Sequence, residues 1–227
     1  IGVIQKMMYK KAPVNTYSPL HNPTKGMTKS GLYKITERKY GTKYPNSYLD
    51  ITYPSKNVEE KHPTLFYFHG GGFFGGSKNM GDPMAATKAT ALLDDLCVAG
   101  FTIVNVDYAL VPDYHFPVPL IQANQAFAWA QKHADEYHLD MENVIVMGSS
   151  AGAIMASQIG SVITNKDYAN LIGVTPSLSP KQLKGVVIDD APLDYDRFPF
   201  ACKLLVGNYI NGTTFLSKEE KSRYNNI

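Results

Sequence analysis

The 227-residue sequence is short of cysteine, of clustered charge and of long apolar runs, and each shortage excludes a class of protein. Its two cysteines, Cys97 and Cys202, are too few for the disulfide framework of a small secreted protein. No apolar run approaches the roughly 20 residues that span a bilayer, and the N-terminus has no signal-peptide pattern. We therefore expect no membrane span, a cytoplasmic location, and a buried, unreactive thiol at Cys97, which lies in an apolar helix-like stretch.

Charge is nearly balanced, with 22 Lys and Arg against 20 Asp and Glu and a net charge of +2. Because no dense block of Lys and Arg occurs, the composition predicts no nucleic-acid partner. Hydrophobic residues make up 44% of the chain and charged residues 19%, as in an ordinary globular protein. We expect a single domain over residues 1–227, with residues 1–30 as a possible cap segment.

Strand-like and helix-like segments alternate from about residue 30 onward. Short apolar or alternating runs predict strands at 48–53, 64–68, 101–106, 143–147 and 183–188. Helical spacing and end signals, among them Asp82-Pro83 at a start and Gly100 at an end, predict helices over 82–98, 117–138 and 151–164. Repeated strand–helix–strand units predict an α/β fold with a mostly parallel central sheet and helices on both of its faces.

The pattern within the segments adds finer expectations. Segment 48–53 alternates apolar and polar residues, which predicts a strand with one face in water. Segment 64–68 is short, apolar and aromatic, which is typical of a strand buried on both faces. Residues from about Tyr33 to Tyr53 would form an antiparallel hairpin at the edge of the sheet. Residues 165–182 and 192–227 look irregular and would be cap segments or surface loops.

A serine-containing turn follows the apolar run 144–147. Residues 148–152 read GSSAG and match G-x-S-x-G, the sharp strand-to-helix turn that holds a serine nucleophile at the top of a sheet. Such a turn needs small residues at both ends, and Gly148 and Gly152 meet that need. The pattern predicts Ser150 as the nucleophile, the backbone N–H of Ala151 as an oxyanion donor, and a Ser149 hydroxyl that points away. The simpler alternative is a tight turn without chemistry.

A glycine-rich loop follows the apolar run 65–68. Residues 69–73 read HGGGF, a pattern whose backbone N–H groups bind the oxyanion formed when a serine attacks a carbonyl. Residues 70–75 also satisfy G-x-G-x-x-G, so a dinucleotide phosphate is the alternative ligand. That alternative is disfavoured because the helix starts only at Asp82-Pro83, and because Asp107 lies further on than the expected ≈ 20 residues. We expect His69 to shape and support this loop.

Histidine is missing where a serine hydrolase of this kind needs one. All six histidines precede Ser150, whereas the triad acid and base follow the serine in the fold that carries this turn. The histidines are His21, His62, His69, His115, His133 and His138. His115 is expected in a turn, and His133 and His138 would lie on different faces of a helix, so no metal site and no cofactor is expected.

The motifs, in their order and spacing, resemble one family. After the HGGGF and GSSAG turns, residues 107–113 (DYALVPD) and Phe116-Pro117 are similar to the D-Y-R-L-A-P-E…F-P segment of the hormone-sensitive-lipase-like esterases of the α/β-hydrolase superfamily. The similarity covers roughly residues 45–195. It implies a three-layer α/β-hydrolase fold, Ser150 as nucleophile, and an oxyanion hole formed by the backbone N–H groups of Gly71, Gly72 and Ala151.

The chain departs from the family pattern in three ways. Ala109 stands where the family usually has arginine, and Ser149 stands where many members have aspartate. The resemblance also places the triad Asp and His beyond the end of this chain, so the C-terminal strands of the domain are expected to be missing. Within the chain, the weaker candidates for the triad acid are Asp189, Asp190, Asp194 and Asp196.

Together these patterns favour a serine hydrolase that cleaves carboxylic esters of short or medium acyl chains through an acyl-enzyme. A small-molecule ester is the expected partner, held in an apolar pocket whose expected lining is Phe73, Phe74, Phe198, Phe200 and Leu204. An amidase or peptidase of the same fold and a non-catalytic α/β-hydrolase-like binding protein are the alternatives, followed by a nucleotide-dependent oxidoreductase. The sequence does not predict an oligomeric state.

Overall fold

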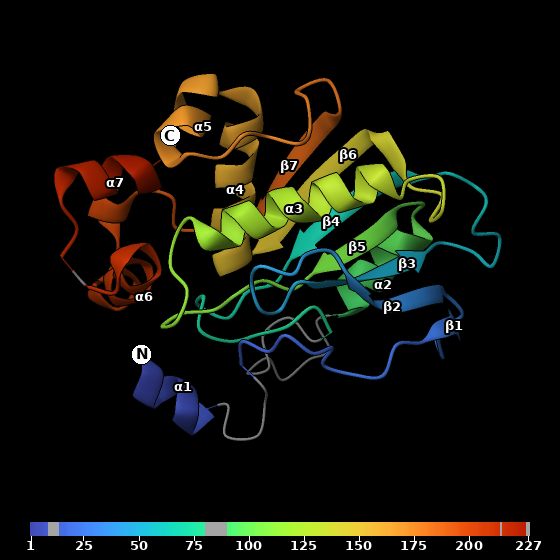
Figure 1. The fold of residues 1–227 in the computed structure, drawn as a ribbon, viewed down its shortest axis with the longest axis horizontal. Helices are drawn as coiled ribbons and strands as arrows, with labels where there is room; N and C mark the ends of the chain where they lie inside the picture. The colour runs from blue at the N-terminus through green and yellow to red at the C-terminus, as the bar shows by residue number, and fades with distance from the viewer. Residues whose placement is uncertain (9–13, 80–89, 214, 226–227) are drawn as a thin grey trace.

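A seven-stranded mixed sheet forms the centre of the computed structural model, which describes residues 1–8, 14–79, 90–213 and 215–225 (Figure 1). The strands lie in the order β1-β2-β3-β5-β4-β6-β7. Their bounds are β1 Lys25–Met27, β2 Tyr33–Lys39, β3 Tyr48–Tyr53, β4 Pro63–Phe68, β5 Thr102–Val106, β6 Asp140–Ser149 and β7 Leu183–Asp189.

The direction of pairing changes across the sheet. Strands β5, β4, β6 and β7 pair in parallel, whereas β1, β2 and β3 are antiparallel to their neighbours. In the parallel part, Phe68 pairs with Gly148 and Ser149 with Asp189. Because the carboxyl ends of β4, β6 and β7 are in register, the loops that follow them start side by side at one edge of the sheet.

Helices cover both faces of the sheet (Figure 1). Phe66 and Phe68 of β4 point to the face that carries α3 and α4, whereas Leu65 and Tyr67 point to the face that carries α2. The helices are α1 Gly2–Met8, α2 Thr90–Val98, α3 Val118–Lys132, α4 Ala151–Thr164, α5 Lys166–Ile172, α6 Phe200–Asn211 and α7 Lys218–Tyr224, with a 3₁₀ turn at Tyr195–Arg197. This is the predicted three-layer α/β fold.

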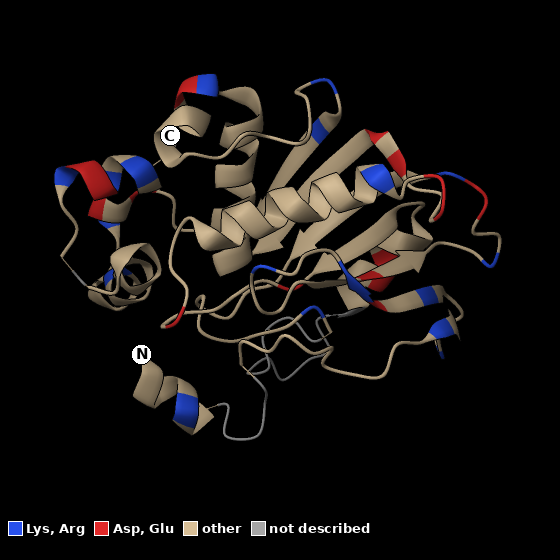
Figure 2. Cartoon of the chain, viewed as in Figure 1, with Lys and Arg blue, Asp and Glu red and all other residues tan. Residues whose placement is uncertain are grey.

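Figure 2 shows where the charged residues lie. They lie on loops, on strands such as β2 and β6 and on the short outer helices, whereas α3 has one charged residue, Lys132, and α4 has none. This distribution fits helices that face the sheet over most of their length. Within the part of the chain that the structure describes, no helix is long and apolar enough to cross a membrane.

Most of the predicted elements are confirmed, with ends that differ by a few residues. Strand β3 and helix α4 have the predicted bounds, and β2 and β3 form the predicted antiparallel hairpin. The hairpin does not lie at the edge of the sheet as expected, because β1 pairs with β2 and takes the edge. Helix α2 ends as expected before Gly100, which has φ +107°. Its predicted start at Asp82-Pro83 lies outside the described residues. The three-residue strand β1 was not predicted.

The prediction of a wet face on β3 is wrong. All six residues of this strand are buried, because both of its faces are covered: Leu49, Ile51 and Tyr53 pack in the main core, and Lys78 and Cys97 contact Asp50 and Thr52. Its polar residue Asp50 is 0% exposed, accepts a hydrogen bond from the backbone N–H of Glu37 and pairs with Lys34 at 3.3 Å. The alternation of apolar and polar residues therefore marks a buried polar network and not a solvated surface.

Two predictions about the later part of the chain are also wrong. The helix expected over 117–138 ends at Lys132, and turns occupy residues 133–138, where His138 has φ +48°. The segments expected to be irregular contain α5, α6 and α7. Signals for these helices are present in the sequence: Ser217 and Glu220 form a capping box at α7, and Gly212 ends α6 in the left-handed conformation.

The thiol of Cys97 is buried as predicted. The residue is 0% exposed and lies 3.6 Å from the carbonyl oxygen of Thr52. Burial and, secondarily, the charge of Asp94 raise the pKa of this thiol to about 12. Neither cysteine forms a disulfide.

Phe127 joins α3 to the sheet, and its removal tests this layer of the core. The side chain is 1% exposed and packs edge-to-face on Phe66 with ring centroids 4.8 Å apart. We expect Phe127→Ala to lower the free energy of unfolding by about 3–5 kcal/mol in urea titrations. Lys132→Ala, on the exposed side of the same helix, should change it by less than about 0.5 kcal/mol, and equal losses in the two variants would contradict this packing.

Candidate active site

Ser150 occupies a strained turn between β6 and α4. Its backbone has φ 52° and ψ −115°, a conformation that L-residues rarely adopt. Its N–H donates to the carbonyl oxygen of Asp189 (2.9 Å), and its carbonyl oxygen accepts from the N–H groups of Ala153 and Ile154 at 3.0 and 3.1 Å. These bonds from β7 and α4 hold the turn, and they leave the Ser150 side chain exposed.

The glycines at the two ends of the turn are required by contact with other backbone atoms. A Cβ at Gly148 would lie 2.1 Å from the carbonyl oxygen of Gly152. A Cβ at Gly152 would lie 2.0 Å from the carbonyl oxygen of Phe68, at the end of β4. The prediction that this turn needs small residues is confirmed, because no side chain fits between β4, β6 and α4.

The glycine-rich loop after β4 folds back on itself beside this turn. Gly71, Gly72 and Phe73 have φ values of +113°, +60° and +65°. The carbonyl oxygen of Gly71 accepts from the N–H groups of Phe74 and Gly75, both at 3.1 Å. A Cβ at Gly70 would lie 3.4 Å from the Cβ of Ser150, so the two motifs are in contact.

A pocket of about 390 Å³ opens over Ser150. It brings together four of the residues that the sequence predicts for the site: Gly72, Phe73, Ser150 and Ala151. The remaining lining comes from Ile154 of α4, from residues 190–192, and from Cys202, Leu205 and Val206 of α6. The pocket is therefore formed between the two motifs and a helix that the sequence did not predict.

Several predicted site residues lie elsewhere. Gly71 is not part of the lining, and neither is Phe74, which is buried and whose carbonyl oxygen accepts from Gln5 Nε2 (2.7 Å). Phe198 is buried against Tyr195 and Tyr224. Phe200 and Leu204 are exposed, because the pocket faces another side of α6. Helix α6 has apolar residues on more than one face, so its sequence does not reveal which of them face Ser150.

Helix α6 is fixed to the glycine-rich loop by two aromatic rings. Phe73 stacks on Tyr209, with centroids 3.6 Å apart and ring planes 3° apart. Both residues are buried, and the carbonyl oxygen of Tyr209 accepts from the N–H of Phe116 (2.8 Å). One wall of the pocket is thereby attached to the loop that carries Gly72.

His69 lies beneath the loop and does not line the pocket. It is 1% exposed, its Nδ1 is 2.7 Å from the carbonyl oxygen of Gly70, and its ring stacks on Tyr108 at 4.3 Å. Burial lowers the pKa of the imidazole to about 4; the hydrogen bond to Gly70 opposes this shift and the charge of Lys78 adds to it. The ring is therefore neutral at physiological pH.

None of the six histidines, all of which lie in described residues, lines the pocket over Ser150. His115 Nδ1 lies 2.6 Å from the carbonyl oxygen of Asn208, and His133 Nδ1 lies 2.7 Å from Glu136. In the described ranges there is also no cluster of three or more His, Cys, Asp or Glu suited to a metal ion.

The acidic residues after β7 have separate environments. Asp189 accepts from the hydroxyl of Ser149 (2.7 Å), which in turn accepts from the hydroxyl of Tyr67 (3.2 Å). Ser149 is thus engaged away from the pocket, whereas Asp190 lines it. The two other candidates make different contacts: Asp194 caps the 3₁₀ turn, and Asp196 pairs with Lys221.

The loop geometry does not match a dinucleotide site. In such a site a helix opens within the glycine fingerprint, so that its N-terminus meets the phosphates. Residues 70–79 contain turns and no helix. The loop instead lies beside Ser150, with which Gly72 shares the pocket.

Comparison with known proteins places the chain among esterases. The BD-FAE family model matches residues 49–195. The chain is 28% identical over 153 residues to an acetyl esterase of Salmonella paratyphi B, a match that covers 62% of this chain and 45% of that protein. It is 31% identical over 113 residues to the acetyl esterase of Salmonella choleraesuis, covering 49% and 33% of the two chains. The chain thus spans about half, or less, of the curated relatives it matches.

Solved structures share the fold. Esterase B of Lactobacillus rhamnosis superposes with a TM-score of 0.65 at 19% identity, covering 91% of this chain and 60% of that one. An esterase of Rhizomucor miehei superposes with a TM-score of 0.54 at 23% identity, covering 90% and 56%.

The contact between the serine turn and its neighbours can be tested with two glycines. Gly148→Ala would push a methyl group into the backbone of Gly152, so we expect the free energy of unfolding to fall by about 3 kcal/mol or more. Gly185→Ala, in β7, meets no atom within 4 Å and should change it by less than about 0.5 kcal/mol. Chemical denaturation measures both, and a neutral Gly148→Ala would show that the turn is not close-packed.

The buried imidazole of His69 gives a pH-dependent signal. A free histidine titrates near pH 6.5, whereas the pKa of His69 is lowered to about 4, so its ¹⁵N shifts should stay those of a neutral ring from pH 8 to 5. On acidification the imidazole of His69 binds a proton near pH 6.5 in the unfolded chain but only near pH 4 in the folded protein. The stability that the neutral His69 contributes should therefore be lost as the pH falls from 6.5 towards 4. A midpoint for His69 near pH 6.5 would show that water reaches the ring.

Proposed function

The chain belongs to the BD-FAE family, an α/β-hydrolase esterase family, and from that premise we propose that it hydrolyses carboxylic esters with Ser150 as the nucleophile. One observation carries the proposal: the exposed Ser150 hydroxyl shares a pocket with the backbone of Gly72 and Ala151. A strained serine and two flanking N–H groups on rigid turns form the arrangement that acyl transfer requires.

The proposed reaction has two steps. Ser150 Oγ attacks the ester carbonyl while a general base takes its proton, and the charge that develops on the carbonyl oxygen is stabilised by the backbone N–H groups of Gly72 and Ala151, which line the pocket. The N-terminus of α4 adds a favourable partial charge, because the first N–H groups of a helix have no partner within it. The alcohol then leaves with a proton, and water hydrolyses the acyl-enzyme.

The general base must be a residue other than the six histidines of this sequence. His69 is buried and neutral beneath the loop, and no other histidine lines the pocket. We propose that the triad Asp and His follow Ile227 in a longer polypeptide, which the length of the curated relatives supports. The role proposed for His69 is to support the loop through its hydrogen bond to Gly70.

The substrate is proposed to be an ester with a short or medium acyl chain. The lining contributed by Phe73, Ile154, Leu205 and Val206 is apolar, and the pocket volume of about 390 Å³ suits a small ligand. The curated relatives are acetyl esterases, which favours the short end of this range.

A fluorophosphonate tests the nucleophile in the full polypeptide, because such reagents label a serine that a base has activated. We expect one adduct by intact mass, mapped by peptide sequencing to Ser150. Ser150→Ala should lose the adduct and lower kcat/KM for p-nitrophenyl acetate by roughly 10³-fold or more.

Ser149→Ala is the matched control, since it removes the neighbouring hydroxyl that bonds Asp189. This variant should keep the label and most of the activity. An active Ser150→Ala variant, or an adduct at another residue, would overturn the assignment of the nucleophile. A full polypeptide that takes up no label would favour a non-catalytic binding protein of this fold.

A further inference from the structure

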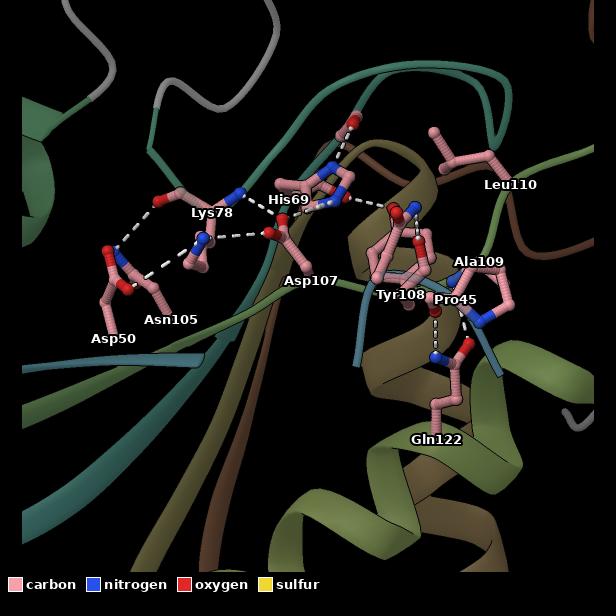
Figure 3. A network of polar contacts seen from close by, with 12 residues as sticks. Pro45, Asp50, His69, Lys78, Asn105, Asp107, Tyr108, Ala109, Leu110 and Gln122 are labelled. Atoms are coloured by element: carbon pink, nitrogen blue, oxygen red, sulfur yellow. Dashed lines mark hydrogen bonds and ion pairs between the residues drawn. The ribbon is translucent and has the colours of Figure 1, made fainter. Parts of the chain in front are cut away.

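A buried lysine lies where the glycine-rich loop ends. Lys78 is 2% exposed, and its ammonium group contacts Glu37 Oε1 at 2.7 Å. Figure 3 shows its two other contacts, with Asp107 Oδ2 at 3.1 Å and Asp50 Oδ1 at 3.9 Å. The three carboxylates come from β2, from β3 and from the end of β5. A charged side chain on a loop is normally solvated, so its burial among three strands needs a structural reason.

Asp107 joins the two ends of the loop. Its Oδ1 accepts from the backbone N–H of Lys78 (2.5 Å) and lies 3.7 Å from His69 Nε2, at the start of the loop. The next residue, Tyr108, donates its hydroxyl to the carbonyl oxygen of His69 (2.5 Å) and stacks on the His69 ring. Residues 107–108 therefore fix residues 69 and 78, and the loop between them is closed at its base.

Lys78 keeps this closure in place through charge. Burial alone would lower the pKa of the ammonium group, but Asp107, Asp50 and Glu37 together raise it, so the group stays charged. Burial raises the pKa of Asp107 to about 6, and Lys78 is what opposes that rise. Without the ammonium group, three buried carboxylates would face one another, with Lys34 contacting Asp50 alone among them in the described residues.

We propose that Lys78 is a positioning residue for the proposed esterase reaction: through Asp107 it holds the loop 69–78 closed, so that the N–H of Gly72 is aimed at the pocket over Ser150. The inference rests on the proposed function. Between the two fixed ends, Phe73 has φ +65°, a conformation that costs a non-glycine residue free energy and persists only where the surroundings enforce it. Oxyanion donors must be held within a fraction of an ångström, so a looser loop lowers the rate more than the affinity.

The test compares Lys78→Met with Lys34→Met in the full polypeptide. Each variant removes one positive charge from the same cluster, but Lys34 contacts Asp50 and not Asp107. We expect Lys78→Met to lower kcat for p-nitrophenyl acetate by about 10²-fold with KM changed less than about threefold, and Lys34→Met to change neither.

Hydrogen exchange supplies a readout that does not depend on catalysis. The amides of residues 70–76 should exchange at least about tenfold faster in Lys78→Met than in the unsubstituted protein, while those of α4 stay unchanged. Faster exchange throughout the sheet, or the same loss of kcat in Lys34→Met, would show that the lysine serves stability alone and would overturn the proposal.

The milder variant Asp107→Asn guards against a Lys78 variant that does not fold. Asp107→Asn alone should lower kcat for p-nitrophenyl acetate and speed exchange at residues 70–76, and an unchanged kcat would contradict the proposal. Where Lys78→Met also folds, the double variant should be no slower than the slower single variant, and additive losses would contradict the proposal. Unchanged exchange and unchanged kcat in Lys78→Met, together with an inactive Ser150→Ala variant, would overturn the positioning role of Lys78 but would not contradict the esterase proposal. Fast exchange at residues 70–76 in Lys78→Met, together with an active Ser150→Ala variant, would show that Lys78 holds the loop but would overturn Ser150 as the nucleophile.

Discussion

The close approach of Gly152 to the end of β4 is the constraint on which the site depends. A methyl group at this position would overlap the carbonyl oxygen of Phe68, so α4 can pack this close to β4 only with a glycine in its first turn. The parallel register that pairs Phe68 with Gly148 then sets both glycine-rich turns at one level of the sheet. Backbone packing, and not a side-chain contact, thus brings the exposed hydroxyl of Ser150 next to the glycine-rich loop.

The base of the glycine-rich loop 69–78 is held by charged side chains and not by backbone packing. The upper side of the loop meets the apolar pocket, whereas its base is held by a buried ammonium group and three carboxylates. Buried ion pairs add little net stability, because desolvation offsets most of the attraction, but they are directional and penalise any arrangement that leaves a charge unpaired. The glycine-rich loop has few side chains whose packing could fix its conformation. The charge cluster at its base fixes that conformation instead.

The sequence predicted those parts of the molecule that depend on short-range backbone requirements. The glycines at 148 and 152, the α4 helix and the parallel strands follow from local patterns, and Ser150 was identified as the candidate nucleophile from the turn alone. The features that depend on packing between distant segments were missed. Asp50 alternates like a solvated strand residue but is buried by its neighbours, and Lys78 looks like an ordinary surface lysine in a loop. To predict the pocket wall formed by α6, one would need to know which face of this apolar helix lies towards Ser150.

The stacked rings of Phe73 and Tyr209 have a consequence for how selectivity can evolve. One helix bears the side chains that bound the pocket and also the ring that steadies the donor loop. Variation along α6 that reshapes the pocket therefore also disturbs the packing of the glycine-rich loop. For the proposed reaction, substrate preference and turnover are coupled through this one helix.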